Sequence, residues 1–159
     1  MQKRLALAAL AVAVAGPALA QESSRGEAKA TVAGKAVSIE YGRPSLRGRD
    51  MMAQAQIGQA WRMGSGAATS LKTEADLAFG SVAVPKGDYV LTATRISADE
   101  WHLNVLKSDR SPVAEIPLAP GKLAASVETF TVSLKGDGEK GELEMQWGTT
   151  ALKAAFTGK

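Results

Sequence analysis

The stretch ETFTVSLKGDGEKGELEMQW, residues 128–147, carries the clearest structural signal in this sequence. Apolar and polar residues alternate on both sides of a glycine-rich centre at Gly136–Gly141. Because successive side chains of a β-strand point to opposite faces, this alternation predicts two strands with one buried and one solvated face. The glycines predict a turn between them, so we expect an antiparallel hairpin.

The same alternation recurs outward from this hairpin in both directions. Further strands are predicted at Ala28–Val32, Val37–Tyr41, Tyr89–Ile96, Trp101–Val105 and Leu152–Phe156, with shorter ones between them. Asp50 is a suitable cap for one short helical turn over Met51–Gln56, and no long amphipathic helix is indicated. Many short strands separated by turn signals are typical of an antiparallel sandwich or barrel. We therefore predict a single-domain, all-β antiparallel β-sandwich over residues 28–159, with barrel-like closure left open and at most one short helix.

The first twenty residues have the pattern of an export signal. Lys3 and Arg4 precede an apolar run, Leu5–Val14, and Ala18–Ala20 supplies the small residues that a signal peptidase reads. The alternative is a membrane anchor, but the run is shorter than the roughly 20 apolar residues that cross a bilayer. We predict cleavage after Ala20, a periplasmic or secreted protein without a membrane span, and a flexible segment at 21–27.

Composition narrows the classes of function. The chain has 19 basic and 16 acidic residues, and loss of Lys3 and Arg4 with the signal peptide leaves a net charge of +1. A nearly neutral domain has no general attraction for nucleic acid, so no nucleic-acid partner is predicted. The chain contains no cysteine, so its core must hold the fold without disulfides.

Positive charge is concentrated between Tyr41 and Thr69. The arginines of this stretch are Arg43, Arg47, Arg49 and Arg62, against a single acid, Asp50. A guanidinium group matches carboxylate, phosphate or sulfate in a planar fork, and an adjacent tryptophan adds a flat apolar face. We therefore predict a surface for an anionic or glycan ligand formed by Arg43, Arg49, Trp61 and Arg62. The alternative is structural, with the arginines holding loop carbonyls and the tryptophan in the core.

Catalytic and metal-binding patterns are weak. Glu142 and Glu144 lie roughly 7 Å apart on one predicted strand face, within the range of about 5 to 10 Å that paired carboxylates use in glycoside hydrolysis. His102, the only histidine, lies on the polar side of its strand and has the chemistry of a general base. Both patterns also fit ordinary solvated strand faces. A hydrolase therefore stays an alternative, and no catalytic residue is assigned.

Other motifs add no cofactor. Gly136–Gly141 matches the letters of a dinucleotide fingerprint, but a strand follows it where that motif requires a helix. One histidine and no cysteine do not supply the ligands of a zinc site. We predict no metal and no cofactor.

Several blocks of the chain match a pattern seen elsewhere. They are Tyr41–Pro44, Gly48-Arg49, Trp61–Thr69, Val84–Tyr89 and Trp101–Val105. Together they resemble an exported bacterial family called domain of unknown function 2911, and Trp-Arg-x-Gly-x-x-x-Ala-Thr is their most specific part. Family members usually carry a proline and an aromatic residue before that block, where this chain has Ile57–Ala60. The resemblance implies an exported β-rich domain and transfers no catalytic residue.

These observations favour a non-catalytic binding or interaction module of the cell envelope with an anionic or glycan ligand. A hydrolase using Glu142, Glu144 or His102, and a structural protein stabilised by its arginines, are the alternatives. The sequence indicates neither the identity of the ligand nor the oligomeric state.

Overall fold

The computed structural model describes residues 24–159, so the predicted signal peptide lies outside the described residues. The elements are β1 (Arg25–Val32), β2 (Lys35–Gly42), α1 (Met51–Gln54), β3 (Ala60–Trp61), β4 (Thr69–Thr73), β5 (Leu77–Phe79), β6 (Val82–Val84), β7 (Gly87–Arg95), β8 (Trp101–Leu106), β9 (Pro112–Asp137) and β10 (Lys140–Gly158). In the described part of the chain the four-residue α1 is the only helix. No helix within residues 24–159 is long and apolar enough to cross a membrane.

The strands form one antiparallel sheet. Its order is β1-β2-β4-β7-β8-β9-β10-β5-β6, and β3 pairs with β7 beside this path. The order is linear, with β1 and β6 at its two ends, so the sheet does not close into a barrel. The prediction of an all-β antiparallel fold with at most one short helix is confirmed.

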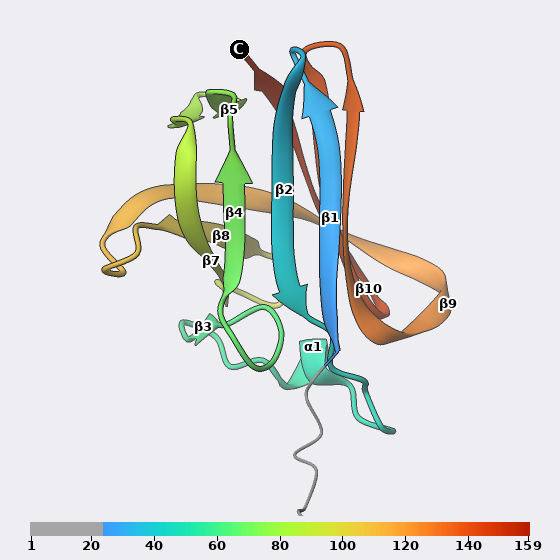
Figure 1. Ribbon diagram of the computed structural model, residues 1–159. Coiled ribbons are helices and arrows are strands. Elements are labelled where there is room, and N and C mark those ends of the chain that lie inside the picture. The colour runs from blue at the N-terminus through green and yellow to red at the C-terminus, as the bar shows by residue number, and fades with distance from the viewer. Residues whose placement is uncertain (1–23) are drawn as a thin grey trace, which may run out of the picture.

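Two long, bent strands fold this sheet into facing layers (Figure 1). The first part of β9 pairs with β8 up to Leu118, and from Ala119 onward β9 pairs with β10. β10 then turns back at Gly148, where φ is +60°, and Gly158 N donates to Glu139 O at 2.8 Å beside the start of the strand. The Tyr41 hydroxyl of β2 donates across the core to Val132 O of β9 at 3.3 Å. The result is a β-sandwich whose two layers belong to one continuous sheet.

An aromatic cluster fills one end of the core. Phe130 of β9 is 1% exposed and packs edge-on against Tyr41, with ring centroids 5.6 Å apart. Trp61 lies 5.1 Å from Phe130 and stacks on Trp147 at 5.8 Å. Trp101 contacts Trp61 at 6.3 Å in a T-shaped arrangement. The buried rings of Phe130 and Trp147, which lie at apolar positions of the 128–147 hairpin, therefore join this hairpin to the rest of the core.

The connection between β2 and β4 closes this end of the sandwich. Phe130 N donates to Pro44 O and Leu46 N to Glu128 O, both at 2.9 Å, so the connection is paired to β9 at its start. Asp50 caps α1 as predicted, and its Oδ1 accepts from Ala53 N at 3.0 Å. The helix ends at Gln54, two residues earlier than expected.

Candidate functional site

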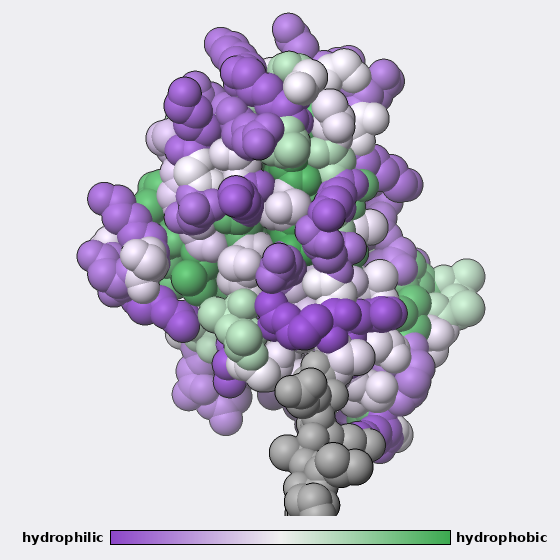
Figure 2. Space-filling view, in the orientation of Figure 1, coloured by the Kyte–Doolittle hydropathy of each residue, from purple (hydrophilic) through white to green (hydrophobic). Residues whose placement is uncertain are grey.

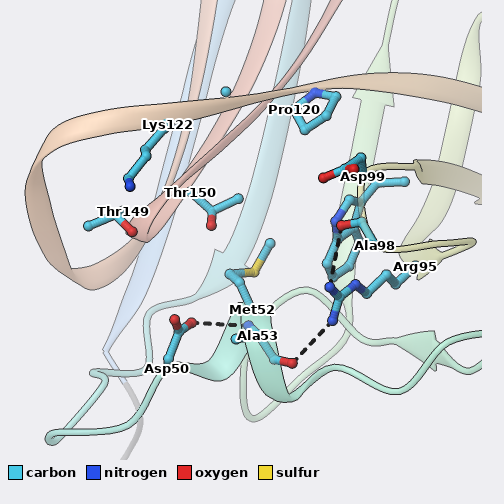
Figure 3. Close-up of a pocket in the computed structure, with 12 residues that line it drawn as sticks. Asp50, Met52, Ala53, Arg95, Ala98, Asp99, Pro120, Lys122, Thr149 and Thr150 are labelled. Atoms are coloured by element: carbon cyan, nitrogen blue, oxygen red, sulfur yellow. Dashed lines mark hydrogen bonds between the residues drawn. The ribbon is translucent and has the colours of Figure 1, made fainter.

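A cleft of about 400 Å³ opens beside α1 (Figure 3). Its polar lining consists of Asp50, Arg95, Asp99, Lys122, Thr149 and Thr150. The side chains of Met52, Trp101 and Pro120 contribute apolar surface. Acidic, basic and hydroxyl side chains therefore meet in one concave site, and convergent polar groups in a cleft mark a candidate ligand site.

Four separate segments build the walls of this cleft. They are α1 with its cap, the β7–β8 turn, the middle of β9, and the turn of β10 at Gly148. In Figure 3 the ribbon of β9 passes over the cleft while α1 lies below it. Lys122 of β9 and Thr150 of β10 are direct cross-strand partners, so their side chains share a face.

Arg95 joins two of these walls. Its NH1 group donates to Ala53 O at 3.1 Å and to Ala55 O at 3.4 Å, at the end of α1. Its Nε and NH2 groups donate to Ser97 O and Ala98 O in the β7–β8 turn, at 3.2 and 3.3 Å. Because a guanidinium has five N–H donors in a fixed fork, one side chain can tie both segments together. Arg95 therefore positions the cleft, and its donors already have partners.

The remaining polar groups of the cleft are available to a ligand. Within residues 24–159, no side-chain hydrogen bond or ion pair engages Asp99, Lys122, Thr149 or Thr150. These groups offer a carboxylate, an ammonium and two hydroxyls, which are acceptors, donors or both. The site is thus equipped to bind a ligand through several hydrogen bonds.

The predicted arginines contact different parts of the backbone. Arg62 NH2 donates to Gly66 O, next to Ala67 O, which accepts from Arg25 NH1 at 3.0 Å. Arg49 Nε makes a long contact of 3.5 Å with Leu46 O. Arg43 is half-buried, and its Nε is a buried atom without a hydrogen-bond partner among the described residues. None of these predicted site arginines lines the cleft of Figure 3.

Trp61, the fourth predicted site residue, belongs to the aromatic cluster. It is half-buried, and Phe130 and Trp147 lie against its ring. It also contacts Trp101, which lines the cleft. Trp61 therefore supports the cleft from behind through Trp101 and does not line it.

His102 lies on the outer face of the sheet between two carboxylates. Its Nδ1 is 2.5 Å from Glu115 Oε1 and its Nε2 is 3.0 Å from Glu100 Oε1. The hydrogen bond to Glu115, followed by that to Glu100, raises the pKa of His102 above its ordinary value, although partial burial opposes this. Both ring nitrogens have partners, so His102 has none free to take a proton from a substrate.

Replacement of His102 by glutamine is expected to weaken the fold in a pH-dependent way. The folded-state pKa of His102 is raised, so its contribution is fully present below the unfolded pKa and is lost as pH rises through the folded pKa. The side chain is 20% exposed and its partners more so, and we therefore expect about 1 kcal/mol or less. Urea unfolding of the wild-type and variant proteins is compared at about pH 5 and about pH 9, on either side of the ordinary pKa of histidine. The variant is expected to be less stable than the wild type at the lower pH and to lose less stability at the higher pH. An equal loss of stability at the two pH values would contradict this prediction.

Glu142 and Glu144 are held by a lysine. Lys153 Nζ lies 3.0 Å from Glu144 Oε2 and 3.8 Å from Glu142 Oε1, and Gln146 Nε2 also donates to Glu144. Hydrogen bonding to Glu144 raises the pKa of Lys153. The expectation that Glu144 lies on a solvated face is wrong, because it is only 8% exposed. The return of β10 at Gly148 lays Lys153 beside it, which alternation along one strand does not reveal.

The weaker motifs also have defined places. Asp137 and Lys140 are paired across the turn that joins β9 to β10, so the glycine-rich segment is a hairpin turn as predicted. Across residues 24–159, no group of three or more histidine, cysteine, aspartate or glutamate side chains is arranged to hold a metal ion.

Comparison with known proteins identifies one family. No curated protein and no solved structure matches this chain. The family model described as "Protein of unknown function (DUF2911)" matches residues 23–156. This range includes β1 to β9 and all but the last two residues of β10. The chain therefore belongs to the DUF2911 family, as its Trp61–Thr69 block and neighbouring motifs predict.

Proposed function

We propose that this protein is an exported, non-catalytic binding module that holds a carbohydrate of the cell envelope in the cleft of Figure 3. The observation that supports the proposal most is the composition of the cleft, where free polar groups of both charges surround an opening of about 400 Å³. The N-terminal sequence, with its basic start and apolar run, supports export.

The chemistry of the cleft fits a sugar. Each sugar hydroxyl both donates and accepts a hydrogen bond, so it is matched by carboxylates, an ammonium and hydroxyls placed together. Asp99 accepts, Lys122 donates, and Thr149 and Thr150 do both, while the exposed Pro120 supplies apolar surface for the ring carbons and the buried Met52 and Trp101 lie behind it. Clefts of this kind bind their ligand through a few placed polar groups on an apolar frame.

The arginine-rich connection supports this assignment indirectly. Arg25, Arg49 and Arg62 donate to backbone carbonyls of loops, and Arg95 donates to Ser97 O in a turn and to Ala53 O of α1. Such contacts satisfy carbonyls that no strand ladder can reach. We assign these arginines mainly to holding the connection that carries α1, and the ligand to the cleft that α1 helps to form.

Binding of soluble envelope glycan fragments, measured by titration calorimetry, tests the proposal. We expect Asp99→Ala and Thr150→Val to weaken binding about tenfold each, because a missing hydrogen-bond partner costs about 1 to 2 kcal/mol. Arg49→Ala and Arg62→Ala are matched controls and are expected to leave affinity within about twofold. The opposite result, with binding lost only in the arginine variants, would place an anionic ligand on the connection. No binding of any fragment would remove the carbohydrate assignment.

A further inference from the structure

We infer that the ligand of the cleft carries a carboxylate, and that Lys122 together with Thr149 and Thr150 receives it. This inference rests on the proposed function and specifies the sugar as an acidic one. It depends on the asymmetry of the cleft, in which the Lys122 ammonium and the Asp99 carboxylate lie on different sides.

One side of the cleft is an anion-binding arrangement. In Figure 3 the Lys122 ammonium points from β9 toward Thr149 and Thr150, and Asp99 lies on the other side next to Arg95. The cross-strand pairing of Lys122 with Thr150 fixes the lysine and the hydroxyl on one face. An ammonium beside two hydroxyls gives three donor groups, and a carboxylate accepts from the ammonium with charge assistance.

Lys122 is distinguished from the other basic group of the cleft by its contacts. Arg95 is already bonded to the carbonyls of Ala53, Ala55, Ser97 and Ala98. No ion pair within residues 24–159 includes Lys122. The positive charge of Lys122 is therefore the one that a bound anion can neutralise.

The position of Lys122 in the β9 arm, residues 117–127, points the same way. This arm contains one charged residue, Lys122, among apolar and small residues. Ala124 and Ala125 are exposed, and Figure 2 shows hydrophobic surface on the right, where the bend of β9 projects in Figure 1. Lys122 is exposed and has no acidic neighbour on this arm, so its charge is open to a bound anion.

The side of the cleft opposite Lys122 completes the match. The Asp99 carboxylate there has no side-chain partner within the described chain. Asp50, which Figure 3 places beside α1 and below Thr149, uses one oxygen to cap α1 at Ala53 N. Carboxylates accept hydrogen bonds from sugar hydroxyls and repel a second carboxylate. The cleft therefore orients an acidic sugar with its carboxylate toward Lys122 and its hydroxyls toward Asp99.

A paired comparison of ligands tests the inference. The probes are a short oligogalacturonate and the same oligosaccharide after carboxyl reduction, which removes the charge and keeps the ring hydroxyls. The protein is compared with Lys122→Met, which keeps the apolar stem, and with Lys122→Arg, which keeps the charge. Calorimetry at low and high salt gives the affinity of each protein for each probe, and thermal melting checks that each variant folds.

We expect the acidic probe to bind about tenfold more tightly than the neutral one, the scale of one charge-assisted contact. Lys122→Met is expected to remove that preference, Lys122→Arg to keep most of it, and high salt to reduce it. Equal binding of both probes, unchanged in Lys122→Met, would overturn the inference and leave the carbohydrate proposal standing. Failure of both probes to bind, at concentrations where all variants are folded, would overturn both the inference and the carbohydrate proposal.

Discussion

Replacement of Phe130 by alanine is expected to lower the free energy of unfolding by about 3 to 5 kcal/mol, the range for deleting a buried phenylalanine. Its side chain is 1% exposed and contacts Tyr41, Trp61 and Trp147 at centroid distances of 5.6, 5.1 and 5.6 Å. These contacts join β2, β3 and β10 to β9. Three large rings cannot all move into the space left by one phenyl group, so a cavity persists and its cost adds to the lost burial.

Urea unfolding followed by tryptophan fluorescence measures this change, because Trp61 and Trp147 both lie against Phe130. Phe130→Leu is the matched control, since it keeps most of the apolar volume and loses the ring, and about 1.5 kcal/mol or less is expected. A loss below about 1 kcal/mol for Phe130→Ala would mean that the aromatic cluster does not hold the layers together.

The long hairpin was predictable because its signal is local. Alternation of two residues decides which side chains of 128–147 face the core, and the glycines at its centre decide where the chain turns. Phe130, Val132, Leu143, Met145 and Trp147 are all buried as this pattern requires. The cap of α1 was predictable for the same reason, since Asp50 accepts a hydrogen bond from the amide of Ala53, only three residues away.

The bends of β9 and β10 could not be predicted in the same way. β10 reverses at Gly148 without the proline, asparagine or paired glycines that mark most turns. The sequence predicts separate short strands, and their pattern does not show that the structure joins them into two long strands, each with a part in both layers. Glu144 is buried for the same reason, because its partner Lys153 lies across an unmarked reversal.

The cleft depends on contacts between distant segments. Arg95 is the last residue of the regular strand β7 and carries no motif, yet it binds carbonyls 42 and 40 residues earlier in the chain. Lys122 and Thr150 become neighbours only when β9 pairs with β10. The arginines drew attention to the connection that carries α1. Sequence reasoning missed the polar groups on the other walls of the cleft, which are Arg95, Asp99, Lys122, Thr149 and Thr150.

Gly42 is the position where a single methyl group is expected to disturb that connection most. A Cβ atom at Gly42 would lie 2.7 Å from both the carbonyl carbon and the amide nitrogen of Ser65, and closer still to the Ser65 oxygen. Real Cβ atoms do not approach backbone atoms this closely, so the Ser65 turn must move. The backbone of Gly42 does not have positive φ, and the effect of alanine is therefore one of space and not of backbone strain.

We expect Gly42→Ala to lower the free energy of unfolding by about 3 kcal/mol, the upper end for overpacking. Displacement of this turn would also remove the carbonyls of Gly66 and Ala67 from Arg62 and Arg25. Gly121→Ala is the matched control, because a methyl group added at Gly121 would have no neighbour within 4 Å and the residue has no positive φ. That variant is expected to change stability by about 0.5 kcal/mol or less. If thermal and urea unfolding showed equal stability for the two variants, the close packing of β2 against the Ser65 turn would not be what holds the connection in place.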